Sequence, residues 1–380
     1  MTESRLIVLT ALILAQALGA CQAPAPAGSK FGQGRAEPAG PMRRVDHLIE
    51  KGEAHFKHLW QVTSGGENTR PRWSPDGDQI AYQFSNLALG IECDLVRVQD
   101  LDTGRLDRVS SGNGVSNVGG YLKGGRQVIF ASTHAIQSDC PAPPDQALGH
   151  VRSLDPAYDL YVVDLDSHDS RVVVDDAGHD AQASVSPGGD RIVFCSLRSG
   201  DAELWSCDSN GGELRQLTRS PGHEADPQWS ADGSRIVFAA TDFDPLREDA
   251  HLGKYRDQLA RWSAAPGSMK IEVMAADGAE RRTVTAPGKA NWDPCFTPDG
   301  QRIVFVSNHH GEGQHPTSYD LFLVDLDGSN LERVTYFDEG IGRQFDGFPS
   351  FSADGRYLAF SSNRGAGQIG ETNVFVAEWR

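Results

Sequence analysis

A short phrase recurs six times between about residue 57 and the C-terminus, and it constrains the fold more than any other feature. Its clearest copies read aromatic, Ser or Thr, Pro or Ala, Asp, Gly, and they stand at 73–77, 229–233, 296–300 and 351–355. Degenerate copies stand at 120–125 and 184–189. An apolar run such as Ile303-Val304-Phe305 follows each copy. Repeats at this spacing indicate one supersecondary unit that is stacked several times.

An Asp-Gly pair between two apolar runs predicts a hairpin, because both residues tolerate the positive φ of a tight turn. A third strand follows the hairpin, as at 321–324, and a fourth follows it, as at 331–335. Four antiparallel strands form one propeller blade, which buries both of its faces against neighbouring blades. Six repeats therefore predict an all-β fold, a six-bladed β-propeller of four-stranded antiparallel blades.

The two ends of the repeat region complement each other. The chain finishes on a third strand, 373–377, whereas 58–63 has the pattern of a fourth strand with no first three before it. Pairing these segments completes the last blade and leaves no long apolar edge. The alternative is an open array of six sheets that needs a partner to close.

These phrases, with the ending Asp325-x-Asp327-Gly-Ser-Asn and the strand 331–335, resemble the WD40-like Pro-Asp-Gly repeats of TolB-type propellers. The resemblance spans roughly residues 57–380. It implies an envelope protein that binds other macromolecules through a propeller face. TolB itself carries an α/β domain before its propeller, whereas only about 35 residues lie between Cys21 and the first strand here.

The N-terminal residues predict export. Arg5 precedes an apolar run, 6–20, that is too short to span a bilayer but suits the core of a signal peptide. The run ends in Leu-Gly-Ala-Cys21, which resembles a bacterial lipoprotein signal and implies cleavage before Cys21 and acylation of its thiol; soluble secretion is the alternative. Gln22 at the next position implies the outer membrane. Residues 22–44 are rich in Ala, Pro and Gly and predict a flexible tether.

The expected organisation is a signal peptide at 1–20, an acylated cysteine and tether with a short helix at 21–56, and the propeller at 57–380. The expected location is the cell envelope, lipid-anchored on the periplasmic side of the outer membrane or at the cell surface. The net charge of −17 opposes broad contact with nucleic acid. The expected partner is an envelope protein or polymer, with membrane contact through the lipid anchor only.

Propeller geometry brings the residues just ahead of each first strand toward the central axis. Those residues are acidic in most repeats and predict a collar for binding at the channel mouth: Glu67, Asp180, Glu224, Asp226, Asp293 and Asp346. Carboxylates gathered in this way could hold calcium or another divalent cation, which takes oxygen ligands in flexible geometry. The alternative is that they only accept hydrogen bonds from neighbouring blades.

Histidines add a second candidate set on the same face. Two precede first strands and others lie in long loops between second and third strands: His134, His179, His223, His309 and His310, with His150, His251 and His315 also in those loops. Histidine with carboxylate suits zinc or manganese, although adjacent residues on extended chain point in opposite directions. A binding role on this loop-bearing face is the main expectation.

Five cysteines follow Cys21, an odd number for an oxidising compartment. Cys93 and Cys140 fall in corresponding loops of neighbouring blades, so a disulfide between them is expected. Cys195 and Cys207 flank one hairpin and are candidates to face each other across strands; buried free thiols are the alternative for both pairs.

Motifs of common enzyme classes are not found in the sequence. His223-Glu224 has no second histidine four positions on, and neither a Gly-x-Ser-x-Gly elbow nor a phosphate-binding Gly-rich loop with lysine occurs. The sequence therefore favours a non-catalytic scaffold. The alternative is a metal-assisted glycan lyase or hydrolase that uses collar acids and loop histidines.

Overall fold

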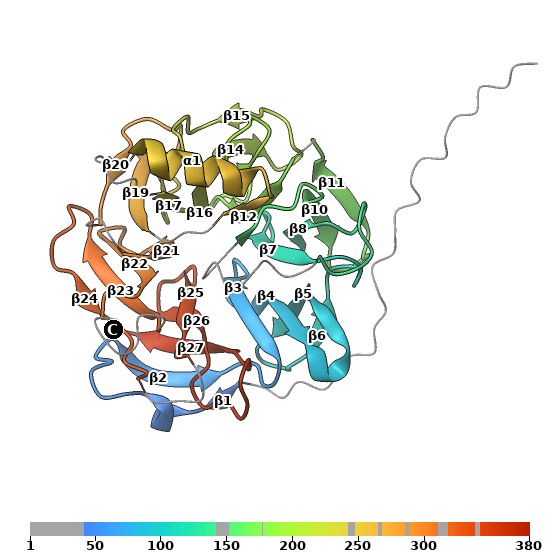
Figure 1. Cartoon of the computed structure of the whole chain (residues 1–380). Helices are drawn as coiled ribbons and strands as arrows, with labels where there is room; N and C mark the ends of the chain where they lie inside the picture. Colours follow the sequence, from blue (N-terminus) through green and yellow to red (C-terminus); the bar gives the residue numbers. More distant parts are fainter. Residues whose placement is uncertain are drawn as a thin grey trace, which may run out of the picture.

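The computed structural model describes residues 42–141, 152–176, 178–241, 248–264, 268–285, 289–310, 318–338 and 343–380. Six antiparallel sheets surround a central axis, as Figure 1 shows. The six-bladed all-β propeller is confirmed. The signal peptide, Cys21 and the tether up to residue 41 lie outside the described residues, as do His150 and His315.

Each blade has four strands, which run from the axis outward in the order of the chain except in the last blade. Their bounds are β3 (Glu67–Trp73), β4 (Gln79–Asn86), β5 (Ile91–Asp100) and β6 (Leu106–Arg108) in blade 1; β7 (Ser116–Tyr121), β8 (Gln127–Ser132), β10 (Asp159–Asp164) and β11 (Ser170–Val174) in blade 2; β12 (Asp180–Val185), β13 (Arg191–Ser196), β14 (Glu203–Asp208) and β15 (Arg215–Gln216) in blade 3. They continue with β16 (Glu224–Trp229), β17 (Arg235–Thr241), β19 (Met269–Ala275) and β20 (Arg282–Thr283) in blade 4; β21 (Asn291–Phe296), β22 (Arg302–Ser307), β23 (Asp320–Asp325) and β24 (Glu332–Arg333) in blade 5; and β25 (Asp346–Phe351), β26 (Tyr357–Ser362), β27 (Asn373–Trp379) and β2 (Phe56–Gln61) in blade 6.

The recurring phrase forms the turn between the first and second strands of a blade. In the clearest copies the hydroxyl of Ser or Thr donates to the turn aspartate, as Ser230 does to Asp232 at 2.6 Å. The same oxygen of Asp232 accepts from the backbone N–H of Ser234, and Gly233 takes a φ of 71°. The phrase therefore supplies a capped tight turn in which only glycine has no steric cost at the last position.

The second strands supply the centre of the core. Each carries a phenylalanine or tyrosine that is buried between neighbouring blades: Tyr82, Phe130, Phe194, Phe238, Phe305 and Phe360. Both faces of these strands are apolar because both are covered, which explains their nearly continuous apolar runs.

The N-terminal strand closes the ring. Strand β2 pairs antiparallel with β27, and Trp60 stands opposite Val376 while Gln61 stands opposite Phe375. This confirms the expected clasp. Residues before β2 are also docked: β1 (Arg43–Arg44) pairs with β2, and the short 3-10 helix η1 (Asp46–Leu48) follows it. The flexible tether expected at 22–44 therefore does not include Arg43 and Arg44.

The two faces of the propeller differ. The turn face carries the Asp-Gly turns, and the loop face carries the connections from second to third strands and from one blade to the next. Blade 1 adds the short 3-10 helix η2 (Leu87–Leu89) on the loop face, and blade 4 adds α1 (Glu248–Leu259). Insertions from blades 2 and 4 meet as a two-stranded sheet, β9 (Arg152–Ser153) with β18 (Ser263–Ala264). Among the described residues, α1 and the other helical turns are all too short or too polar to cross a bilayer.

Candidate functional site

The first strand of five blades bends at one residue in the left-handed region of backbone space. These residues are Arg70, Gln182, Asp226, Asp293 and Phe348, with φ between 43° and 56°, and each coincides with a shift in strand register. Such a bulge re-aims a side chain at a cost in backbone strain. Arg70 of blade 1 contacts side chains of blades 4, 5 and 6, so the bulge residues reach the axis.

Two arginines and two aspartates form an ion cluster at the axis. The Nη1 atom of Arg70 lies 3.2 Å from Asp293 Oδ1 and 3.5 Å from Asp226 Oδ1. Arg152, carried by β9, lies 2.7 Å from Asp226 Oδ2. The backbone N–H of Asp293 also donates to Asp226 Oδ2 at 3.4 Å. Both carboxylates are buried.

The two aspartates titrate differently. Burial disfavours the charge of Asp226, but Arg152 and Arg70 outweigh it and hold its pKa well below the usual range. Burial and the negative charge of Asp226 raise the pKa of Asp293 to about 7. When two carboxyl groups share one buried site, their pKa values move apart, because the second group must ionise against the negative charge of the first.

We expect the Asp293→Asn variant to show a flatter dependence of stability on pH. The folded-state pKa of Asp293 lies above its unfolded value of about 4. Its contribution to stability is therefore complete below pH 4 and is lost as the pH rises to about 7. Urea denaturation between pH 4 and 7 measures the difference, and equal slopes for variant and wild type would contradict the assignment.

The remaining expected collar acids do not join this cluster. Asp180 pairs with Arg198 at 2.9 Å, Glu224 with Arg281 at 2.8 Å, and Asp346 with Arg364 at 3.0 Å. Each of these buried pairs is formed within one blade. Glu67 is exposed, and its neighbour Asn68 is the residue buried at the start of β3. The expectation of one open acidic collar is therefore wrong: Asp226 and Asp293 meet at the axis under Arg152, and the other four do not.

The histidines are not gathered into one site either. His179 and His223 are buried close to the ion cluster; burial lowers the pKa of His179 to about 4, and burial with the nearby Arg152 lowers that of His223 to about 3. Elsewhere, His134 packs against Tyr161, and His309 and His310 pack against Phe322.

One group on the loop face has the spacing of a cation site, formed by His310, Asp320 and Asp338. His310 Nδ1 lies 3.0 Å from Asp320 Oδ2. The guanidinium of Arg333 contacts both aspartates, Asp320 at 2.6 Å. This arginine already forms an ion pair with each of the two carboxylates.

The open cavity at the axis lies on the turn face. It has a volume of about 670 Å³, and the ends of the first strands from all six blades line it. Arg72, Gln228 and Ser350 contribute polar groups, and Trp73, Trp229 and Phe351 contribute aromatic surface. Residues at the opening include Ala231 and Ala353, which are exposed. Sequence reasoning placed the binding surface on the other face.

Comparisons with known proteins agree with this architecture. The family described as the TolB beta propeller domain matches residues 138–248. A protein of Chlorobium luteolum named as a TolB homolog is 30% identical over 159 residues, which are 36% of this chain and 35% of that protein. A solved structure from Agrobacterium tumefaciens, assigned as TolB, superposes with a TM-score of 0.53 at 19% identity and covers 83% of this chain and 91% of that one. The chain carries a TolB-like propeller.

Other relatives do not point to one activity. An uncharacterised protein of Agrobacterium fabrum is 24% identical over 333 residues, or 85% of this chain and 93% of that protein. Among solved structures, an oligogalacturonate lyase in complex with manganese superposes with a TM-score of 0.50 at 14% identity, covering 90% of this chain and 97% of that one. At this identity such a likeness shows the fold alone.

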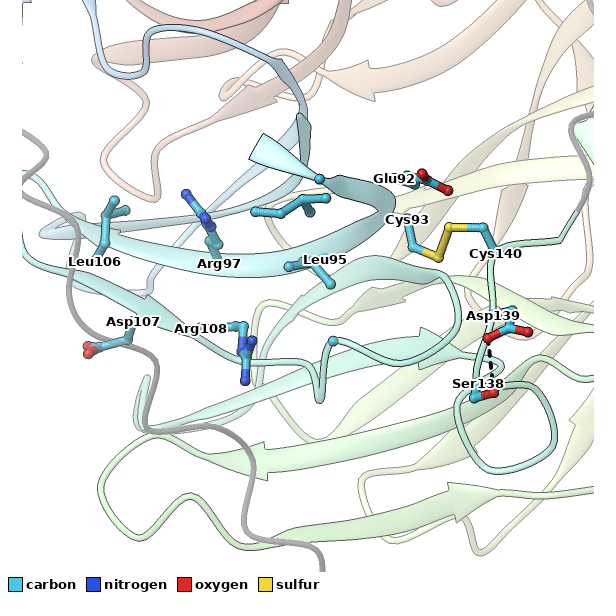
Figure 2. Close-up of a pocket in the computed structure, with 13 residues that line it drawn as sticks. Glu92, Cys93, Leu95, Arg97, Leu106, Asp107, Arg108, Ser138, Asp139 and Cys140 are labelled. Atoms are coloured by element: carbon cyan, nitrogen blue, oxygen red, sulfur yellow. Dashed lines mark hydrogen bonds between the residues drawn. A yellow bond between two sulfur atoms is a disulfide. The ribbon is translucent and has the colours of Figure 1, made fainter. Parts of the chain in front are cut away.

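The TolB-like propeller also has a side pocket of about 510 Å³ beside a disulfide that joins blade 1 to blade 2, shown in Figure 2. The disulfide joins Cys93 and Cys140, the pair suggested by the sequence. Arg97 and Arg108 line the pocket together with three acidic residues, so its charge is mixed.

Cys195 and Cys207 do not face each other, because Cys195 stands opposite Leu204 and Cys207 opposite Ile192; both are buried free thiols.

Arg70 and Arg152 are the functional candidates that sequence reasoning missed. The sequence did contain a signal for Arg70. In four of the six repeats the bulge residue comes directly before a proline, and in two of these four repeats that residue is one of the candidate acids, Asp226 or Asp293. The sequence contained no such signal for Arg152, because this residue reaches the axis from a long insertion of blade 2 rather than from a repeated strand.

Proposed function

We propose that this TolB-like propeller is a non-catalytic binding scaffold of the bacterial cell envelope, held to a membrane by a lipid on Cys21, and that it takes up a segment of a partner protein in the turn-face cavity. The observation that carries the proposal is the cavity itself, to which every blade contributes. A segment that enters along the axis would contact all six blades at once, and concave sites of this kind are the usual places where proteins bind ligands.

Charges of both signs lie in and around the cavity lining. Asp354 lines the cavity, and Asp76, Asp232 and Asp299 each follow a lining residue in the chain, whereas the basic residues Arg72 and Lys123 also line it. Hydrogen bonds from Ser230 and from a backbone N–H lower the pKa of Asp232 to about 2, and similar bonds lower those of Asp299 and Asp354. The carboxylates of Asp232, Asp299 and Asp354 are therefore charged at neutral pH. A partner segment that carries both acidic and basic side chains would match this mixed charge.

The loop face supports binding at the axis less well. Asp226 and Asp293 are buried, already paired with arginines and covered by the insertion that carries Arg152. A catalytic acid and base would need access to substrate in a pocket. The ion cluster is better explained as a structural connection between blades 1, 4 and 5 and that insertion.

Filling the cavity tests the proposal. Ala231→Trp together with Ala353→Trp adds two indole rings at exposed positions of the opening, so folding should be unaffected. In pull-downs from detergent-solubilised envelopes we expect this variant to lose its partner by at least about 10-fold, because the occupied cavity excludes the segment.

The matched control is Asn210→Trp, which adds the same ring at an exposed turn of blade 3 outside the cavity lining. It should recover the partner as the wild type does. Equal recovery by the filled variant and the control would show that the partner does not use the cavity.

A further inference from the structure

The four most exposed large apolar side chains among the described residues lie on three neighbouring loops of the loop face. Ile369 is 80% exposed in the β26–β27 loop of blade 6, and Leu87 and Leu89 are 78% and 58% exposed in η2 of blade 1. Ile136 is 70% exposed in the segment that follows β8 of blade 2. We call these four residues the apolar rim. Isolated exposed leucines need no explanation, but a group on one face does.

Contacts hold the three loops that carry the apolar rim next to one another. The side chain of Glu371 accepts from the N–H of Gly65 at 3.1 Å, and Thr372 donates its N–H to the carbonyl of Gly66 at 3.0 Å. A Cβ on Gly66 would lie 2.9 Å from the Cβ of Asn86, so this backbone packs tightly against the start of η2. The disulfide between Cys93 and Cys140 then ties blade 1 to the loop that carries Ile136.

The chain enters the propeller beside the apolar rim. Arg43 of β1 stands opposite Gln61, next to the connection that leads onto the loop face. Met42 packs against the same apolar cluster as Ile91, which begins the strand after η2. Residues 22–41 separate this point from Cys21, and a chain of that length reaches at most about 70 Å.

We propose that the apolar rim docks onto the surface of a lipid bilayer. The inference rests on the proposed lipid anchor, which would hold this face near the membrane. The rim consists of side chains that project from loop tips rather than line a groove, which suits shallow insertion among lipids. The three loops (86–92, 133–141 and 363–372) contain one lysine or arginine, Arg364, and it is buried. The surface is therefore suited to zwitterionic lipid, and the net charge of −17 disfavours anionic lipid. Docking in this orientation leaves the turn-face cavity open toward the aqueous side.

The test uses a chain without the lipid. All six blades and the clasp lie within residues 42–380, so residues 22–380, exported behind an unrelated cleavable signal, keep every described contact. We expect this chain to float with vesicles of phosphatidylcholine and phosphatidylethanolamine. The combined variant Leu87→Ser, Leu89→Ser, Ile136→Ser and Ile369→Ser should lower the partition coefficient by roughly 10-fold or more, because binding scales with buried apolar area.

The matched control carries Val172→Ser, Leu214→Ser and Leu331→Ser, which remove exposed aliphatic side chains away from the rim. It should float as the parent chain does. No flotation of the parent chain, or equal flotation of the rim variant, overturns bilayer docking. Loss of a protein partner by the rim variant, without any vesicle binding, overturns it in favour of a protein contact.

Labelling of the full chain with radioactive palmitate, with Cys21→Ser as the control, reports on the anchor separately. Flotation without labelling upholds the rim and rejects the anchor, whereas labelling without flotation does the reverse.

Discussion

Replacing Arg364 with methionine should lower the free energy of unfolding by about 3–5 kcal/mol. The guanidinium of Arg364 lies 2.9 Å from Glu53 Oε1 and 3.0 Å from Asp346 Oδ2, and all three side chains are fully buried. Without the arginine, two carboxylates would remain buried with no opposite charge. Urea denaturation of the two proteins at pH 7 measures the loss.

The loss should depend on pH. Burial already raises the pKa of Glu53 despite the presence of Arg364, and removal of the arginine would raise it further. A carboxyl whose folded-state pKa exceeds its unfolded value contributes stability at low pH and loses it as the pH rises. The variant should therefore be closest to wild type near pH 5 and furthest from it above pH 7.

Two controls make this prediction specific. Adding Glu53→Gln and Asp346→Asn to the Arg364→Met variant should recover much of the loss, because the uncompensated charges are then removed. Arg356→Met, at an exposed position of the same blade, should change stability by less than about 0.5 kcal/mol. A loss for Arg364→Met as small as that for Arg356→Met would show that the buried ion pairs contribute little.

The same ion pairs show where the sequence stopped being informative about the fold. The blades and the clasp follow from a repeated turn and from strand periodicity, both of which are local patterns. Docking of residues 45–55 has no such pattern, because it depends on Glu53 meeting an arginine 311 residues away. The composition of residues 22–44 suggested a tether, whereas the contact with Arg364 explains why residues 45–55 are docked.

The axial site was predictable to the level of the strand but not of the side chain. Glu224 and Asp226 begin the same strand, yet Glu224 pairs with Arg281 within the blade while Asp226 reaches the axis. The choice is made by the bulge at Asp226, whose φ is 51°, and strand alternation alone does not reveal it. Long insertions such as the one that carries Arg152 differ from blade to blade and do not follow the repeat, so the repeat does not predict where their residues lie.

Shortening Leu59 to alanine should loosen the whole ring rather than the last blade alone. Leu59 is fully buried in β2 and belongs to the large apolar cluster formed with blades 4 and 5. Removing its side chain should cost about 2–5 kcal/mol. If the ring is one cooperative unit, this cost should appear at sites that do not touch the clasp.

Cys195 and Cys207 provide such a readout in blade 3, because both are free thiols without solvent exposure. Alkylation of these thiols requires opening of the blade, so a loss of 3 kcal/mol should speed their labelling by roughly 100-fold. Mass spectrometry distinguishes them from Cys295 by peptide. Lys57→Ala, at an exposed position of the same strand, removes one ion pair with Glu378 and should change the rate little.

The outcome decides between two descriptions of a repeat protein. In a linear array each unit depends on its neighbours, and a weak end frays without consequence for the middle. In a closed ring there is no end, since β2 and β27 make the first blade a neighbour of the last. Unchanged labelling of Cys195 and Cys207 in the Leu59→Ala protein, despite a lower unfolding free energy, would mean that blade 6 opens alone and that the clasp joins the ends without coupling the blades.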